Sequence, residues 1–213
     1  MIIYLTKKIW SGQSLARILM NDALRKYTIS GKVLDIGGAR SPDYFKYLNV
    51  AENTEIISSD MMLPQSKGIN FEKDSLPYKN EEIDHVLMFN ILEHIFNHQF
   101  LVGEAHRVLK NNSKILGFVP FLVNYHPDPH DFFRYTKEAL IKILEKSGFK
   151  DIEVKEIGRG PFAVNYNNLV FSVPIIMRVI LLPVYHFLDS IFIKFRPKIG
   201  IRYPLGYIFS AKK

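Results

Sequence analysis

The segment from Asp35 to Ala39 reads Asp-Ile-Gly-Gly-Ala and joins an acidic residue to small ones. Small residues let a ligand approach the backbone closely. Asp60 follows Gly37 by 23 residues (60 − 37), near the spacing at which a carboxylate accepts hydrogen bonds from a ribose. The segment lacks the G-x-G-x-x-G pattern of a dinucleotide site, and an acid would repel phosphate. The segment therefore suits a positively charged nucleoside ligand. A nucleoside that carries a sulfonium and a free amino group has such a positive charge.

A second group of chemically active side chains lies in the segment 124–136, which reads NYHPDPHDFFRYT. A histidine oriented by an acid suits general-base catalysis near neutral pH. We expect His130 with Asp131, or His94, to serve in this way. A structural reading stays open, in which Arg134 pairs with Asp131 while the aromatic residues pack. A metal site at His126, Asp128 and His130 is not expected, because no distal ligand is evident.

These residues need elements that bring them together. Apolar runs at 32–36, 55–58, 69–71, 83–89, 115–121, 152–157 and 207–211 predict seven strands, and helical patterns lie at 14–26, 91–109 and 136–148. The alternation predicts an α/β, Rossmann-like, mostly parallel sheet sandwiched by helices. Ligands of such sheets bind beyond the carboxyl ends of the strands. Asp35 with the glycines, Asp60, Asn90, His94 and the segment from Pro120 to Tyr135 all follow predicted strands.

Several segments, taken in order, resemble the class I S-adenosylmethionine-dependent methyltransferases, in particular a type 11-like subgroup. VLDIGG is similar to that family's first motif, IISSD to its second strand, and EAHRVLKNNSKILGFVPF to its turn into the fifth strand. NFEKDSLPYKNEEIDHVLMFNILEHI is similar to the stretch that ends in the "LEH" helix start. The resemblance implies S-adenosylmethionine as cofactor, with Ala39 replacing a usual glycine. It implies cofactor contacts at Asp35, Gly37, Gly38, Ala39, Asp60, Met61, Asn90 and an adenine-contacting acid, for which Asp74 is preferred to Glu72.

The apolar stretch 169–195 precedes the last predicted strand. Its prolines and charges are expected to prevent a membrane-spanning run, while residues from Val184 to Phe195 form one apolar helical face. The net charge of +7 falls entirely within residues 157–213, which suggests an anionic partner for this part of the chain, although solubility alone would also explain it. A lid, a homodimer contact and peripheral membrane contact through 169–195 all stay open, and no nucleic-acid partner is expected.

Length and composition limit the remaining choices. The chain of 213 residues suits a single domain, with a core at about 30–157 plus 205–213 and a helical apolar insertion at about 166–203. The absence of cysteine excludes disulfides and fits the cytoplasm. We predict a methyltransferase that acts on oxygen of a small-molecule, glycan or lipid-linked acceptor. The alternatives are a non-catalytic scaffold or sensor and a nicotinamide or nucleotide-sugar Rossmann enzyme.

Overall fold

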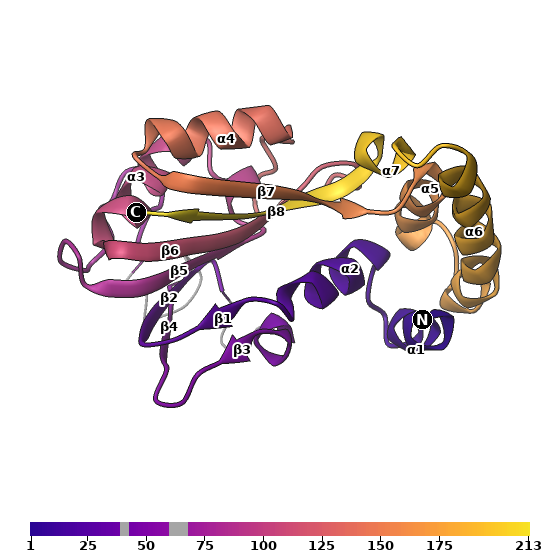
Figure 1. The fold of residues 1–213 in the computed structure, drawn as a ribbon, viewed down its shortest axis with the longest axis horizontal. Helices are drawn as coiled ribbons and strands as arrows, with labels where there is room; N and C mark the ends of the chain where they lie inside the picture. Colours follow the sequence, from indigo (N-terminus) through magenta and orange to yellow (C-terminus); the bar gives the residue numbers. More distant parts are fainter. Residues whose placement is uncertain (39–42, 60–67) are drawn as a thin grey trace.

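A six-stranded sheet in the order β4-β2-β5-β6-β8-β7 forms the centre of the molecule (Figure 1). The computed structural model describes residues 1–38, 43–59 and 68–213. All neighbours from β4 to β6 are parallel, and β8 runs antiparallel to both β6 and β7. The sheet strands are β2 (Lys32–Ile36), β4 (Glu55–Ser59), β5 (Ile83–Phe89), β6 (Leu109–Pro120), β7 (Lys150–Gly158) and β8 (Pro204–Lys212).

Helices cover both faces of this sheet. On one face, α3 (His98–Val108) and α4 (Lys137–Lys146) bury Leu101, Ala105 and Leu140 against the strands. On the other face lie α2 (Leu15–Leu24) and the 3-10 turn η1 (Asp43–Tyr47). A small parallel pair, β1 (Thr28–Ile29) with β3 (Asn49–Val50), lies beside them. The predicted Rossmann-like sandwich is confirmed.

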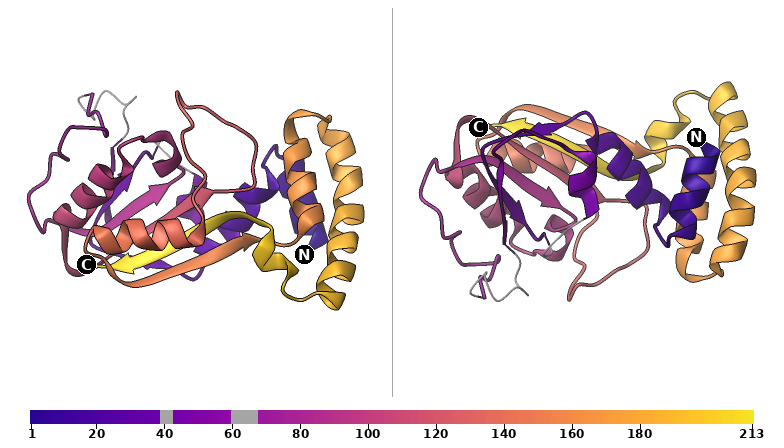
Figure 2. Two further views of the ribbon diagram at one scale, coloured as in Figure 1. Left: turned by 90° about the horizontal axis from the view of Figure 1, so that it is seen from above. Right: turned by 90° about the horizontal axis from the view of Figure 1, so that it is seen from below.

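The remaining helices form a separate layer at one end of the sheet, which we call the helical layer (Figures 1 and 2). Leu5, Ile18, Tyr166 and Leu182 are buried together there, from four different helices. In both views of Figure 2, α6 is the outermost element and α5 lies inside it. The layer contains α1 (Ile2–Trp10), the N-terminal part of α2, α5 (Pro161–Asn168), the 3-10 turn η4 (Leu169–Phe171), α6 (Ile175–Phe195) and α7 (Ile199–Arg202).

Helix ends follow the local signals in the sequence. The Ser14 hydroxyl accepts a hydrogen bond from the Arg17 amide at the start of α2. The Thr136 hydroxyl does the same for the Ala139 amide at the start of α4. Gly148 closes α4 with a φ of 94°, in the left-handed region where only glycine is unstrained. These caps fix where α2 and α4 begin and where α4 ends, and therefore where the chain enters the strands that follow these helices.

Three elements differ from the sequence-based expectation. Residues 69–71, expected to form a third strand, lie in turns, and Phe71 is buried in the core instead. The sheet of the described residues therefore has six strands rather than seven. The helix expected from 91 to 109 is divided into η3 (Leu92–His94) and α3. The Glu72 carboxylate accepts hydrogen bonds from the Phe96 and Asn97 amides at the break. In a continuous helix these amides would instead donate to the backbone carbonyls four residues earlier in the chain.

The expectation that prolines interrupt the apolar stretch 169–195 is wrong. Pro174 precedes the first turn of α6, and Pro183 lies inside a continuous helix of 21 residues. A proline removes one backbone hydrogen bond, but Arg178 and Asp189, which are buried on either side of it, hold the helix to its neighbours. By length and composition alone, α6 is the single helix among the described residues that is apolar enough to cross a membrane.

Candidate functional site

The larger of the two cavities lies where the carboxyl ends of β2, β5 and β6 meet the helical layer. Its volume is about 710 Å³, within the range of small-molecule and cofactor sites. Three groups of residues line it. The segments at the strand ends contribute Gly37, Gly38, Asp43, Tyr44, Phe89, Asn90, His94, Phe118 and Pro120, the loop after β6 contributes Val123, Asn124, His126 and Asp128, and the helical layer with α2 contributes Gly12, Gln13, Ser14, Ala16, Arg17, Met20, Asn167, Val170 and Phe171.

The glycine turn after β2 forms one wall of the cavity. Gly37 has a φ of 80°, which only glycine adopts without strain. A Cβ atom added at Gly38 would lie 1.8 Å from Asp35 Oδ2, so the turn and the carboxylate are in direct contact. Asp35 itself is buried, and the Tyr44 hydroxyl donates a hydrogen bond to its carboxylate. The turn thus holds an acid close to a backbone that a ligand can approach.

The other sequence-predicted cofactor residues have different surroundings. Asn90 follows β5 and lines the cavity, with a φ of 52°. Asp74 is exposed and accepts a hydrogen bond from the Asn70 amide, and it does not line the cavity. Ala39, Asp60 and Met61 lie outside the described residues.

A cluster of two histidines around a buried acid lies at the edge of the cavity. Glu93, in η3, has no exposed surface, and neither of its carboxylate oxygens has a hydrogen-bond partner among the described residues. Its Oε1 atom lies 3.7 Å from His94 Nε2 and 3.7 Å from His126 Nε2. Both histidines line the cavity, and the Glu93 carboxylate raises the pKa of His126. The cluster thus gives the cavity a polar, titratable edge.

The same three side chains have the composition of a metal site. Their candidate ligand atoms all lie within 4.8 Å of one another, and histidine with glutamate is a usual donor set for transition metals. His126 therefore has distal neighbours that the sequence did not reveal. These neighbours, Glu93 and His94, differ from Asp128 and His130, which were considered with His126 as metal ligands from the sequence alone.

Asp131 does not orient His130. Its carboxylate pairs with the Arg134 guanidinium and accepts a hydrogen bond from the His126 amide at 3.0 Å. The His130 side chain is exposed and packs on Phe132, while its carbonyl oxygen contacts His94 Nδ1. The structure thus brings His94 and His126 together at the cavity and places His130 outside its lining. Asp131 fixes the loop that carries His126.

The Asp131–Arg134 pair gives a prediction for stability. Hydrogen bonds from Arg134 lower the pKa of Asp131 to about 2. A depressed carboxyl pKa stabilises the fold above the unfolded-state pKa, and this contribution is lost as the pH falls toward the folded-state value. We expect Asp131→Asn to lower the free energy of unfolding by about 2 kcal/mol at neutral pH. Urea titrations at several pH values should show this difference from wild type narrowing below about pH 4, and a pH-independent difference would contradict the assignment.

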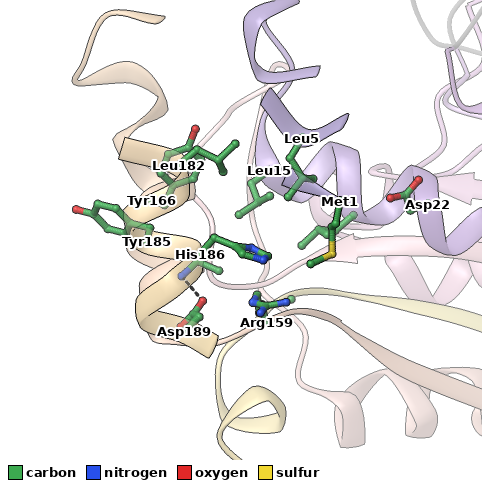
Figure 3. A pocket seen from close by; sticks show the side chains of 13 residues that line it. Met1, Leu5, Leu15, Asp22, Arg159, Tyr166, Leu182, Tyr185, His186 and Asp189 are labelled. Atoms are coloured by element: carbon green, nitrogen blue, oxygen red, sulfur yellow. Dashed lines mark hydrogen bonds between the residues drawn. The ribbon is translucent and has the colours of Figure 1, made fainter. Parts of the chain in front are cut away.

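The smaller cavity, of about 110 Å³, lies inside the helical layer (Figure 3). It is bordered by Met1, Leu5 and Leu182, together with Arg159 and His186. Asp189 at its edge is fully buried, and its carboxylate accepts hydrogen bonds from the Phe162 and Ala163 amides at the start of α5. Burial raises the pKa of Asp189. These polar contacts join α5 to α6, so this cavity belongs to the packing of the layer.

Comparison with known proteins supports the resemblance seen in the motifs. Residues 47–117 match a family model described as a methyltransferase domain. These residues include β5, η3 and most of β6, and with them Asn90 and His94, which line the larger cavity. The match confirms the resemblance to class I S-adenosylmethionine-dependent methyltransferases, with S-adenosylmethionine as the cofactor.

Solved structures extend the likeness of fold to nearly the whole chain. A solved S-adenosylmethionine-dependent methyltransferase from Archaeoglobus fulgidus is 19% identical, with a TM-score of 0.57 over 99% of each chain. The cyclase SpnF shares the fold at 14% identity and a TM-score of 0.56, over 93% of this chain and 80% of that one. An uncharacterized protein of Methanocaldococcus jannaschii is 27% identical over 63% of this chain and 72% of its own length.

The residues of the larger cavity fit S-adenosylmethionine. Gly37 and Gly38 line the cavity without side chains, and the buried Asp35 carboxylate lies against Gly38. A cationic sulfonium ligand matches the negative charge of this carboxylate. The ends of β2 and β5 are therefore the candidate cofactor site, and His94 and His126 line the same cavity.

Proposed function

We propose that the chain methylates a hydroxyl oxygen of a small-molecule, glycan or lipid-linked acceptor, and that His126 takes the proton from that hydroxyl. The observation that carries this proposal is the buried Glu93 carboxylate, which faces the His126 ring at the cavity edge. His130 and Asp131, the candidates suggested by the sequence, are not assigned this role, because neither lines the cavity.

When bound, S-adenosylmethionine supplies a methyl group that the sulfonium has already activated. What is left to the protein is to position the acceptor and to remove its proton. We propose that Asp35, Gly37, Gly38 and Asn90 hold the cofactor, and that Ala39, Asp60 and Met61 contribute to the same site. The acceptor then occupies the space bordered by Asn124, His126, Asp128 and Val170.

The Nδ1 atom of His126 has two polar neighbours. It lies 3.1 Å from the Asn124 carbonyl oxygen, which can only accept, and 3.4 Å from Arg134 Nη2, which can only donate. We propose the tautomer in which Nδ1 carries the hydrogen toward the closer Asn124 oxygen, so that the Nε2 lone pair receives the proton. Once it does, the positive ring lies 3.7 Å from Glu93 Oε1, which stabilises it. The Asp131 carboxylate, which lies 3.7 Å from Nδ1, also stabilises the positively charged ring.

The strength of this base favours oxygen as the methylated atom. A neutral amine already has a lone pair for attack, whereas a hydroxyl becomes a good nucleophile only as its proton leaves. A histidine whose conjugate acid is stabilised by a buried carboxylate provides that removal. His94 Nε2 lies 3.7 Å from the same Glu93 oxygen, and its ring is in edge contact with the His126 ring.

The proposal predicts a pH dependence. Because Glu93 raises the pKa of His126 and the base must be neutral, the rate at saturating cofactor should rise through a pKa above the ordinary histidine value of 6.5. Glu93→Gln should lower the rate and move this acid limb to lower pH, since the neutral amide no longer stabilises the imidazolium. Glu81→Gln, at an exposed glutamate, should change neither.

The assay is transfer of a labelled methyl group from S-adenosylmethionine to a panel of hydroxylated metabolites, glycans and polyprenyl-linked sugars. The same assay with a chelator separates the base from a metal at Glu93, His94 and His126. We expect the chelator to leave the rate unchanged. If the chelator abolishes activity and added zinc or manganese restores it, a metal ion and not the His126 base would activate the acceptor. Methylation of amine acceptors alone would contradict the choice of oxygen. Cofactor binding without transfer to any acceptor would favour the scaffold or sensor alternative.

A further inference from the structure

α6 departs from the pattern of a surface helix in a soluble protein, because it is apolar on its outward side as well as where Leu182 packs into the layer. Such helices bury an apolar stripe and expose charged residues. In α6 the two charged residues before its last turn, Arg178 and Asp189, are buried, at 6% and 0% exposure. The outward stripe is apolar and contains Ile176, Ile180, Val184, Phe187 and Phe195, which are 51–76% exposed, with Met177 and Phe192 beside it. We call these seven residues the α6 face.

The inward charges have partners that fix this orientation. The Arg178 guanidinium donates to the Gln13 carbonyl oxygen at 3.1 Å. The Asp189 carboxylate accepts from the Phe162 and Ala163 amides, and an added Cβ at Gly160 would lie 2.4 Å from Asp189 Oδ1. Turning α6 to bury its apolar face would break all of these contacts. The exposed face is therefore built into the layer, and a soluble monomer rarely exposes such a continuous apolar patch without a partner.

Positive charge accompanies the α6 face. Lys194, Arg196, Lys198 and Arg202 are exposed, and none of them forms an ion pair among the described residues. From residue 159 to 203 the sequence contains a single acidic side chain, Asp189, and it is buried. No exposed carboxylate of this segment opposes the four basic residues. Their unpaired charge is complementary to an anionic surface.

We infer that the α6 face docks onto an anionic lipid bilayer, with its apolar residues in the headgroup boundary and the basic residues after it against the phosphates. Apolar burial together with basic charge is the combination that holds amphipathic helices in the plane of a membrane. A second copy of the chain would place the same positive charge against itself, which argues for lipid as the occupant.

The helix lies along the membrane and does not span it. Its 21 residues are long enough to cross a bilayer. However, α5 packs against its inner side, and the chain continues from α6 through α7 into β8 within the central sheet. Both ends of α6 are thus attached to the same folded unit on one side of the membrane. Phe171, which is 78% exposed, lines the larger cavity just before α6, so a docked molecule has this cavity close to the lipid surface.

Co-sedimentation of the full chain with vesicles tests this inference. The vesicles contain phosphatidylcholine mixed with phosphatidylglycerol, and pure phosphatidylcholine vesicles are the neutral control. We expect the wild type to pellet with the anionic vesicles, and less so at high salt. Combining Ile180→Asn with Phe187→Asn should raise the lipid concentration for half-binding by about tenfold or more. Combining Lys194→Gln, Arg196→Gln and Lys198→Gln should raise it by about a hundredfold.

Matched controls come from the far side of the molecule. Val50→Asn removes an exposed apolar side chain, and a triple change of Lys142, Lys146 and Lys150 to glutamine removes exposed positive charge outside the helical layer. Both controls should bind vesicles almost like the wild type. Failure of the wild type to bind anionic vesicles, or equal losses in the control variants, would overturn the inference. A dimer that Phe187→Asn dissociates, without vesicle binding, would also overturn it in favour of a second copy.

Discussion

His126→Ala should lower the rate of methyl transfer by about 10²- to 10⁴-fold, the usual contribution of a positioned general base. In the proposed tautomer its Nε2 atom has the free lone pair, and the Glu93 carboxylate stabilises the proton that this atom receives. Because His126 is not among the residues that we propose to hold the cofactor, we expect the affinity for S-adenosylmethionine to stay close to that of the wild type. Single-turnover rates and calorimetric titrations of the same protein preparation separate the two effects.

His130→Ala is the matched control for this experiment. His130 is four residues from His126, but its side chain is exposed and outside the cavity lining. Its contact with His94 uses the backbone carbonyl oxygen, which an alanine retains. We expect this variant to transfer methyl groups at nearly the wild-type rate. A large loss at His130 together with a small one at His126 would contradict the proposed base and restore the first candidate.

Gly38→Ala should weaken S-adenosylmethionine binding by about tenfold or more, which corresponds to at least about 1.4 kcal/mol. The added methyl group would lie 1.8 Å from Asp35 Oδ2, so the carboxylate must leave its present position beside the turn. Asp35 is buried and bound by the Tyr44 hydroxyl, which leaves it little room to move. Calorimetric titration with the cofactor and with S-adenosylhomocysteine measures the effect.

Gly103→Ala provides the control for a glycine substitution. Gly103 lies inside α3, and an added Cβ would have no neighbour within 4 Å. Replacing a glycine inside a helix by alanine stabilises the helix by about 1 kcal/mol. This variant should therefore unfold at a slightly higher temperature and bind the cofactor like the wild type. Equal binding by Gly38→Ala would contradict the placement of the cofactor against the glycine turn.

Local signals made the sheet and the glycine turn predictable from sequence. The buried run of β5, the cap residues Ser14 and Thr136, and Gly148 after α4 each act within a few residues. The division of the helix expected at 91–109 depends on the Glu72 carboxylate, more than twenty residues away in the chain. A contact of that kind leaves no periodic pattern in the sequence.

The histidine cluster shows the same limit within the site. The sequence places His94, His126 and His130 near strand ends, but it does not show which rings share a buried acid. Glu93 is part of the "LEH" segment, and its burial between two imidazoles depends on the path of the loop after β6, which Asp131 and Arg134 fix. For α6, the sequence shows an apolar and a polar face. Only the tertiary contacts of Arg178 and Asp189 show that these two charged residues are buried in the layer.

The central claim is that Asp35 and the glycine turn bind S-adenosylmethionine. Calorimetric titration of the wild type and of Asp35→Asn with S-adenosylmethionine, S-adenosylhomocysteine and NADH tests it most directly. We predict that the wild type binds the first two ligands and not NADH, and that Asp35→Asn, which removes the negative charge beside the turn, binds S-adenosylmethionine clearly more weakly. Binding of NADH alone, or equal affinity of the two proteins for S-adenosylmethionine, would contradict the account.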